Sequence, residues 1–322
     1  MTIRVAAVQM ESKNGQVAAN LQYATLLVHR AAQREARVIL LPELMSAGYI
    51  FATSIWEGAE AAQGPTVRWL QNTSRELRVW LGTSFLEADG QDFFNTFVLA
   101  APDGRIAGRV RKQTPAVYEA FFTRGTAGSH IIETDFGKVG VGICYENQLA
   151  YIPETMHRES ADLLLMPHSA PTVRKLLGDR RVKGFEKSLR DLALRYARLM
   201  GIPVVMANKC GPWQSPLPGL PFQHEVSSFP GLSAIADSDG TLKAQLAAEE
   251  GVVVEDVTLD PSRKTTLTPQ RYGRWAWSDA YGLPWLLRKS CPIIESVGGL
   301  WYTSSIRRRR EARQVSSMVA VP

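Results

Sequence analysis

Short apolar runs alternate with helical hydrophobic patterns over most of the chain, and this alternation limits the possible folds more than any other feature. Residues 3–8 and 38–41 are strand-like runs, and between them apolar residues repeat at intervals of three and four. The same alternation recurs from residue 65 to 110 and from 138 to 207. Strands that alternate with helices favour an α/β fold, which we therefore predict.

Two segments in the second half interrupt this pattern. Residues 209–230 contain five prolines, which predict an irregular surface or active-site loop, because proline lacks the N–H that regular structure needs. Farther on, residues 232–236 and 252–257 are apolar runs separated by an Asp-Gly turn at 239–240. They predict a hairpin that closes the sheet region.

The alternation ends near residue 258, and no change of composition divides the chain before that point. We predict one catalytic domain over residues 1–258, followed by a C-terminal arm over residues 259–322. The arm is rich in tyrosine, tryptophan and arginine. Because its aromatic side chains would otherwise expose a large apolar patch, we expect it to pack on the body or on a partner subunit.

The positive charge of the chain is concentrated at its C-terminal end. Five arginines and one glutamate among residues 307–322 account for +4 of the net charge of +6. The rest of the chain is nearly neutral, so its charge does not indicate a nucleic-acid-binding domain. We expect the arginine run itself to be solvated and mobile.

Three cysteines without CxxC or CxH spacing argue against both a disulfide framework and a zinc site. We expect a reducing, cytoplasmic location and no metal. No run of about 18 apolar residues is present, which argues against a membrane span. The first residues also lack the features of a signal peptide.

Cys144 ends an apolar strand and precedes polar residues and a helical pattern. A thiol at such a junction lies at the carboxyl edge of the sheet, where α/β proteins place their sites. The N-terminus of the following helix favours the thiolate, so Cys144 is a candidate nucleophile. A buried structural cysteine is the alternative that this position alone leaves open.

Two further strand ends carry charged side chains. Glu43 follows the strand at 38–41 directly, and Lys112 follows the strand at 105–110. A carboxylate at this edge is a candidate base for a thiol, and a lysine beside a thiolate lowers its pKa and stabilises an oxyanion. Either residue taken alone also fits an ordinary solvated charge.

The order of these motifs resembles a known signature. Leu-Pro-Glu at 41–43, Arg-Lys at 111–112 with Glu119, and Gly-Ile-Cys-Tyr-Glu at 142–146 are similar to the Glu-Lys-Cys motifs of the nitrilase superfamily of carbon-nitrogen hydrolases. The similarity extends over about residues 3–258. It implies a four-layer αββα sandwich that forms a homo-oligomer and needs neither metal nor organic cofactor.

The resemblance also implies roles for these residues. Cys144 would be the nucleophile, Glu43 the general base, and Lys112 with the backbone N–H of Tyr145 the oxyanion donors. Glu119 would orient the lysine or the substrate. Substrate-binding candidates are the residues expected to face Cys144, namely Tyr49, Tyr118, Glu146, His168 and Ser169.

The residues around the motifs divide between two reactions. Residues 41–49 and 117–122 resemble amidases and carbamoylases, whereas Cys-Tyr-Glu-Asn at 144–147 and the long aromatic arm are closer to nitrilases. We expect hydrolysis of a small non-peptide amide or carbamoyl amide to acid and ammonia or amine, with a nitrilase forming a thioimidate as the alternative. An alternative of another class is a binding protein that holds RNA or an acidic protein through its arginine-rich tail.

Overall fold

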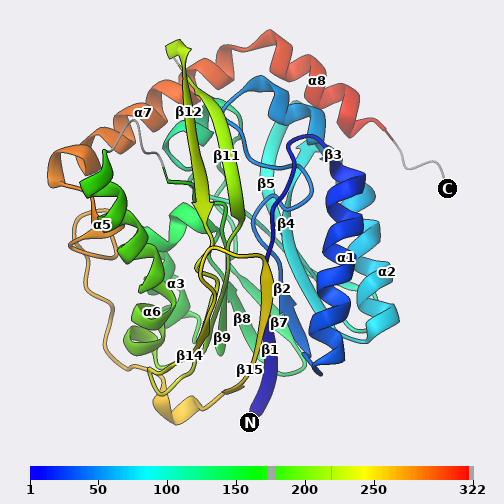
Figure 1. The fold of residues 1–322 in the computed structure, drawn as a ribbon, viewed down its shortest axis with the longest axis vertical. Coiled ribbons are helices and arrows are strands. Elements are labelled where there is room, and N and C mark those ends of the chain that lie inside the picture. Colours follow the sequence, from blue (N-terminus) through cyan, green and yellow to red (C-terminus); the bar gives the residue numbers. More distant parts are fainter. Residues whose placement is uncertain (173–177, 219, 319–322) are drawn as a thin grey trace.

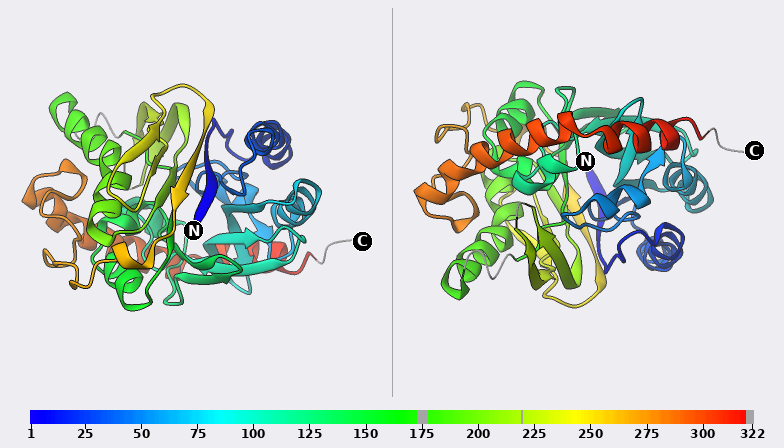
Figure 2. Two further views of the ribbon diagram at one scale, coloured as in Figure 1. Left: turned by 90° about the horizontal axis from the view of Figure 1, so that it is seen from below. Right: turned by 90° about the horizontal axis from the view of Figure 1, so that it is seen from above.

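The computed structural model describes residues 1–172, 178–218 and 220–318, and in it two β-sheets pack face to face between layers of helices (Figure 1). Figure 2 shows α1 and α2 outside one sheet and α5 and α6 outside the other. Apolar side chains from both sheets, among them Leu40, Phe97, Val141 and Val205, form one core cluster. This arrangement confirms the predicted αββα sandwich.

The first sheet has seven strands in the order β15-β1-β2-β4-β5-β6, with β3 paired to β4. Strands β1, β2 and β4 run parallel to one another, and the pairs at either side of them are antiparallel. The strand bounds are β1 Thr2–Gln9, β2 Val38–Leu40, β3 Glu60–Ala61, β4 Trp80–Asp89, β5 Asp92–Ala100, β6 Ile106–Arg111 and β15 Gly251–Thr258.

The second sheet has six strands in the order β14-β13-β10-β9-β8-β7, and its middle strands β8, β9 and β10 are parallel. Two more strands, β11 and β12, form a separate antiparallel ribbon. The bounds are β7 Ile131–Thr134, β8 Gly137–Val141, β9 Leu163–Pro167, β10 Val204–Ala207, β11 Cys210–Leu217, β12 Leu220–Pro230, β13 Ala234–Ala236 and β14 Leu242–Gln245.

The helices lie where the hydrophobic periodicity predicts them in the first 200 residues. Helix α1 buries Leu21, Ala24 and Val28, which share one face, and α2 begins at Pro65, whose fixed φ suits a first helical turn. No helix in the described part of the chain is long and apolar enough to cross a bilayer. The bounds are α1 Val17–Gln33, α2 Pro65–Leu77, α3 Tyr151–Arg158, α5 Asp179–Arg190, α6 Leu192–Met200, α7 Trp285–Ser304 and α8 Ile306–Ser316, with short 3-10 helices η1 Thr53–Gly58, η2 Val117–Phe121, η3 Cys144–Gln148, η4 Pro261–Arg263 and η5 Ala280–Gly282.

The predicted hairpin between residues 232–236 and 252–257 is wrong. The turn at 239–240 joins β13 to β14, and β15 instead pairs with β1 in the other sheet, with Thr2 opposite Thr258. Strand β14 has the sequence Leu-Lys-Ala-Gln and is largely exposed at the sheet edge, so it carries no apolar run. Because β14 has no apolar run, the sequence pattern does not indicate it, and the next apolar segment, β15, was predicted as the partner strand instead.

The irregular loop predicted over residues 209–230 is also wrong, because this segment forms the β11–β12 ribbon. Pro212 and Pro216 lie four residues apart in β11, so both have the same orientation in the strand. The carbonyl of Ser228, opposite Pro212, accepts a hydrogen bond from the Thr172 N–H and thus points away from β11. Prolines at such outward-facing positions of a two-stranded ribbon remove no ladder hydrogen bond.

The C-terminal segment forms two helices, which cross the top of the molecule in Figure 1. Helix α7 lies against η2, and α8 lies against β4 and β5. The sequence periodicity of α7 is weak because Leu286 and Leu300 are exposed while other apolar residues of the helix face the protein. Because its apolar residues are spread in this way, the sequence of α7 shows no single apolar face that would predict a helix.

The arginine run is not entirely solvated, which corrects that expectation. Arg308 is 4% exposed, forms an ion pair with Asp92, and has its guanidinium carbon 4.5 Å from the ring centre of Tyr302. The hydroxyl of Tyr302 accepts a hydrogen bond from the Phe93 N–H of β5 at 2.8 Å. Arg308 therefore fastens the C-terminal helices to the first sheet.

We predict that Arg308→Ala lowers the free energy of unfolding by about 3 kcal/mol, because it leaves a half-buried carboxylate without this partner. Arg310→Ala is the matched control, since Arg310 is exposed on the same helix, and we expect a change of at most about 0.5 kcal/mol. Urea denaturation of the three proteins measures both values. Equal losses in the two variants would contradict the anchoring role.

Candidate active site

Side chains at the ends of four strands converge at one edge of the two sheets. Glu43 follows β2, Lys112 follows β6, Cys144 follows β8, and Ser169 follows β9. Two hydrogen bonds connect the ends of β2 and β9: the Glu43 N–H donates to the His168 carbonyl at 3.2 Å, and Ser169 Oγ donates to the Glu43 carbonyl at 2.6 Å. Because parallel strands end at the same edge, residues distant in sequence meet here.

Cys144 is the first residue of η3 and has a φ of +53°. This left-handed conformation is unfavourable for a residue with a Cβ, so the surrounding contacts must hold it. Glu146 does so, because its carboxylate accepts the Ile143 N–H at 3.2 Å and the Gln113 N–H at 2.6 Å. The sharp turn places the Cys144 thiol in the wall of a cavity.

Lys112 lies between two buried carboxylates. Its Nζ is 2.6 Å from Glu43 Oε1 and 2.6 Å from Glu119 Oε2, and all three side chains are at most 1% exposed. Asn95 Nδ2 joins the carboxylates, with distances of 2.8 Å to Glu43 Oε1 and 3.1 Å to Glu119 Oε1. Charges buried this deeply are tolerated only when they are paired and hydrogen-bonded, as they are here.

Glu119 is fully occupied by protein groups. Besides Lys112 and Asn95, it accepts the Tyr49 hydroxyl at 3.3 Å and the Thr123 hydroxyl at 3.3 Å. The carboxylate lies behind Tyr49 and is absent from the described wall of the cavity. Its geometry suits orienting the lysine.

Burial and charge set the protonation of the group. Burial lowers the pKa of Lys112, but Glu119 and Glu43 raise it above its ordinary value, so the ammonium stays charged. Burial raises the pKa of Glu43 above its ordinary value against the opposing effect of Lys112. Glu43 Oε2 is buried and has no hydrogen-bond partner in the described part of the chain, which leaves one oxygen able to take a proton.

The surroundings of Cys144 disfavour its thiolate form. Burial raises its pKa well above the ordinary value, the negative charge of Glu43 raises it further, and Lys112 opposes both effects. Lys112 thus lowers the pKa of the thiol as expected, but burial outweighs this effect. The helical element after Cys144 is only the five-residue η3, so a base must remove the proton.

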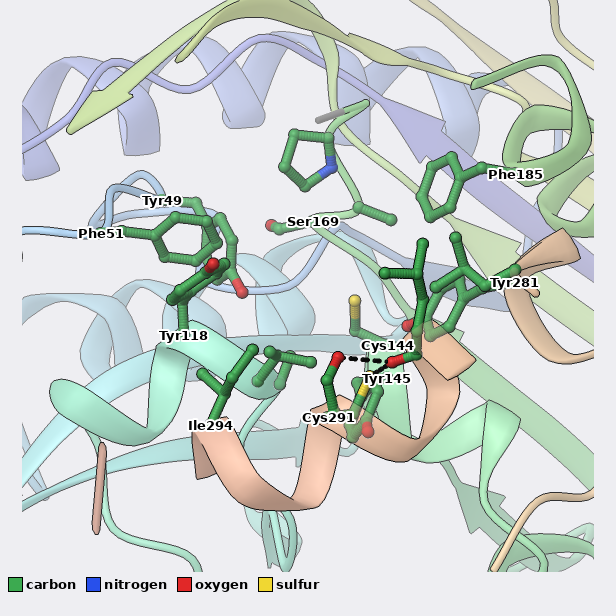
Figure 3. Close-up of a pocket in the computed structure, with 17 residues that line it drawn as sticks. Tyr49, Phe51, Tyr118, Cys144, Tyr145, Ser169, Phe185, Tyr281, Cys291 and Ile294 are labelled. Carbon is green, nitrogen blue, oxygen red and sulfur yellow. Dashed lines mark hydrogen bonds between the residues drawn. The ribbon is translucent and has the colours of Figure 1, made fainter. Parts of the chain in front are cut away.

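The cavity beside Cys144 has a volume of about 210 Å³ (Figure 3). Among the predicted substrate-binding residues, Tyr49, Tyr118 and Ser169 line it. The sequence did not predict the other residues of the wall. For some of them, the only indication in the sequence was the large number of aromatic residues after residue 258. Those labelled in Figure 3 are Phe51, Phe185, Tyr281, Cys291 and Ile294.

Two predicted substrate-binding residues, Glu146 and His168, are absent from the described wall of the cavity. Glu146 is buried and also accepts the Tyr151 hydroxyl at 2.6 Å. His168 Nε2 is 3.1 Å from Asn147 Nδ2, and burial lowers the pKa of His168 to about 3. Both side chains support the turn that carries Cys144.

Lys209 is a second buried lysine near the site. It follows the end of β10, and its Nζ donates to the Leu44 carbonyl at 3.0 Å. Burial lowers its pKa to about 7, although Glu43 and Cys144 oppose this effect. The only indication of this lysine in the sequence was its position at the end of a strand.

No group of three or more His, Cys, Asp or Glu side chains among the described residues is arranged to hold a metal.

The chain matches the carbon-nitrogen hydrolase family over residues 4–266. It is 28% identical over 270 residues to an N-carbamoylputrescine amidase of Solanum tuberosum, covering 80% of this chain and 87% of that protein. It is 31% identical over 169 residues to a nitrilase of Pyrococcus abyssi, covering 51% of this chain and 64%, less than two thirds, of that protein. An amidase structure from Nesterenkonia sp. superposes with a TM-score of 0.67 at 22% identity, covering 82% of this chain and 93% of that one.

The buried His168 predicts a specific loss of stability in acid. Its pKa is about 3 in the folded protein and about 6.5 when unfolded, so between these values the unfolded chain binds more protons. The contribution is present above pH 6.5 and is lost as the pH falls. In urea denaturation between pH 6 and pH 4, we expect the unfolding free energy of wild type to fall more steeply than that of His168→Gln, by up to about 1.4 kcal/mol per pH unit. Parallel profiles would contradict this assignment.

Proposed function

This chain belongs to the carbon-nitrogen hydrolase family, and we propose that it hydrolyses a small non-peptide amide or carbamoyl amide through a cysteine acyl-enzyme. The observation that carries the proposal is the Cys144 thiol at a cavity, near the carboxylate of Glu43, one oxygen of which is held by the buried Lys112. These are the parts that a thiol hydrolase requires: a nucleophile, a base and a fixed positive charge.

In the first step, Cys144 Sγ attacks the carbonyl carbon and its proton passes to Glu43. A C–S bond forms, and the π electrons of the carbonyl move onto its oxygen. Glu43 Oε2 is the acceptor that we assign, because Oε1 already binds Lys112 and Asn95. Proton transfer and attack occur together, since burial disfavours a resting thiolate.

Lys112 and the backbone N–H of Tyr145 are the proposed oxyanion donors. The lysine remains cationic because both of its neighbours are carboxylates. The Tyr145 N–H belongs to the first turn of η3, where N–H groups have no partner within the helix. Donors that are already in place stabilise the developing charge without reorganisation.

Collapse of the tetrahedral intermediate returns the carbonyl and breaks the C–N bond. Glu43 gives its proton to the departing nitrogen, so ammonia or an amine leaves and a thioester remains on Cys144. Water then attacks the thioester as Glu43 takes one of its protons. The acid is released when the C–S bond breaks, and the proton on Glu43 returns to the thiolate.

Nitrile hydrolysis is the second candidate reaction. It is favoured by the similarity to the Pyrococcus abyssi nitrilase and by the Cys-Tyr-Glu-Asn sequence at 144–147. The same thiol would add to the nitrile carbon to give a thioimidate, which two waters convert to acid and ammonia. We place amides first because the similarity to an amidase extends over a larger share of both chains.

We predict that ammonia release from a matched set of amides, carbamoyl compounds and nitriles occurs with one class and disappears in Cys144→Ala, because the acyl-enzyme then cannot form. The variants Glu43→Gln and Lys112→Met should lose at least about 100-fold in kcat/KM. Circular dichroism of each variant is the control for folding. Release that persists in Cys144→Ala would exclude the thiol mechanism, and release from nitriles alone would favour the second candidate.

We also propose that the protein works as a homo-oligomer. Helix α7 exposes a row of large apolar side chains at Leu286, Ile293, Val297 and Leu300, each between 53% and 73% exposed. Contiguous exposed apolar residues mark association surfaces. Light scattering should give a multiple of the 35.6 kDa chain mass, and Val297→Glu should reduce it. A wild-type mass of one chain at micromolar concentration would contradict this proposal.

A cytoplasmic location is the third part of the proposal. Its support is that all three cysteines, Cys144, Cys210 and Cys291, are free and buried. Unpaired thiols are typical of proteins that work in a reducing compartment. A free nucleophilic thiol would also be protected from oxidation there.

A further inference from the structure

The wall of the cavity is built from aromatic and aliphatic side chains. Phe51, Tyr118 and Ile294 line one side, and Phe185 and Tyr281 line the other (Figure 3). Among the described residues of the wall there is no aspartate, glutamate, lysine, arginine or histidine. A substrate group that enters this space leaves water for an apolar surface.

Several polar side chains of the wall already have protein partners. The Tyr49 hydroxyl donates to Glu119, Ser169 Oγ donates to the Glu43 carbonyl, and the Tyr145 hydroxyl donates to Glu295 at 2.6 Å. Among the described residues of the wall, a charged group on a substrate would find neutral hydroxyls such as those of Tyr118 and Tyr281 but no opposite charge. Burying a charge without an opposite charge beside it is costly.

Much of the apolar wall comes from the C-terminal segment. Tyr281, Leu283, Leu287 and Ile294 all lie beyond residue 266, where the match to the family ends. The far wall of the cavity is thus supplied by a part of this chain outside the family match. It is a feature of this protein that the shared hydrolase motifs do not specify.

Tyr281 is fixed in place despite an unfavourable backbone conformation. It has a φ of +57°, and its ring stacks between those of Tyr145 and Phe185, at centroid distances of 5.8 Å and 5.4 Å. The next residue, Gly282, packs so closely on Gly184 that an added Cβ would lie 2.5 Å from backbone atoms. Strain that is held by packing on both sides is typical of a site residue.

We propose that residues 281–294 select substrates whose acyl group is uncharged and apolar. This inference rests on the proposed hydrolase function and names the substrate class for the same site. An apolar acyl chain gains free energy by leaving water, whereas a carboxylate or ammonium of the same length loses its hydration without meeting an opposite charge among the described wall residues. The chemistry at Cys144 then acts on amides or nitriles that carry such a chain.

The test compares three amides of similar length with the wild-type protein: hexanamide, the monoamide of glutaric acid, and 5-aminopentanamide. We expect kcat/KM for hexanamide to exceed that for either charged amide by at least about 100-fold. A charged amide hydrolysed as well as hexanamide, in a reaction lost in Cys144→Ala, would overturn this inference and leave the proposed function intact. Absence of Cys144-dependent turnover for all three amides and for hexanenitrile would overturn both.

Substitutions in the wall then test which residues determine the preference for an apolar acyl group. Ile294→Lys adds a cation to the wall and should raise the ratio of kcat/KM for the glutaric monoamide to that for hexanamide by at least about 10-fold. Leu26→Lys is the control, because Leu26 is 56% exposed on α1 and outside the cavity, and its ratio should equal that of wild type. An unchanged ratio in folded Ile294→Lys would overturn the assignment to residues 281–294. If that variant does not fold, the wild-type comparison still decides the substrate class.

Discussion

The buried ammonium of Lys112 between two carboxylates is the interaction on which the rest of the site depends. It joins the end of β6 to the end of β2 and to the 3-10 helix η2, so it holds two strand ends of the first sheet and a neighbouring helix around one charge. Three ionisable groups at most 1% exposed would be strongly destabilising if any partner were missing. The same contacts that hold the fold at this edge therefore hold the proposed base and oxyanion donor in register with Cys144.

Lys112 and Cys144 are both buried, but the outcome for their charge is opposite. For Lys112, the neighbouring charges outweigh desolvation and the cation persists, whereas for Cys144 desolvation dominates and the thiol stays protonated. In the proposed mechanism, a protonated Cys144 lies near the Glu43 carboxylate, whose Oε2 has no hydrogen-bond partner among the described residues, and the thiol loses its proton only as it attacks. Such a site would avoid a permanently reactive thiolate while keeping the groups needed to generate one.

The sequence predicted the convergence of Glu43, Lys112 and Cys144 because each directly follows an apolar strand, and parallel strands end at one edge. It could not predict the wall of the cavity, because α7 has apolar residues on both its inner and outer sides and so lacks a clear periodicity. Strand β15 was misplaced for a different reason. Its partner β1 lies some 250 residues earlier, and nothing local distinguishes it from the second strand of a hairpin.

The proposed reacting groups all lie before residue 258, whereas part of the apolar wall comes from residues after 280. The later stretch is nevertheless coupled to Lys112, because α7 packs on η2, which carries Glu119, and Glu295 of α7 accepts the Tyr145 hydroxyl. In evolutionary terms, an exchange of the C-terminal helix between related genes would change the cavity wall, and it would have to keep these contacts for the ancestral site to survive.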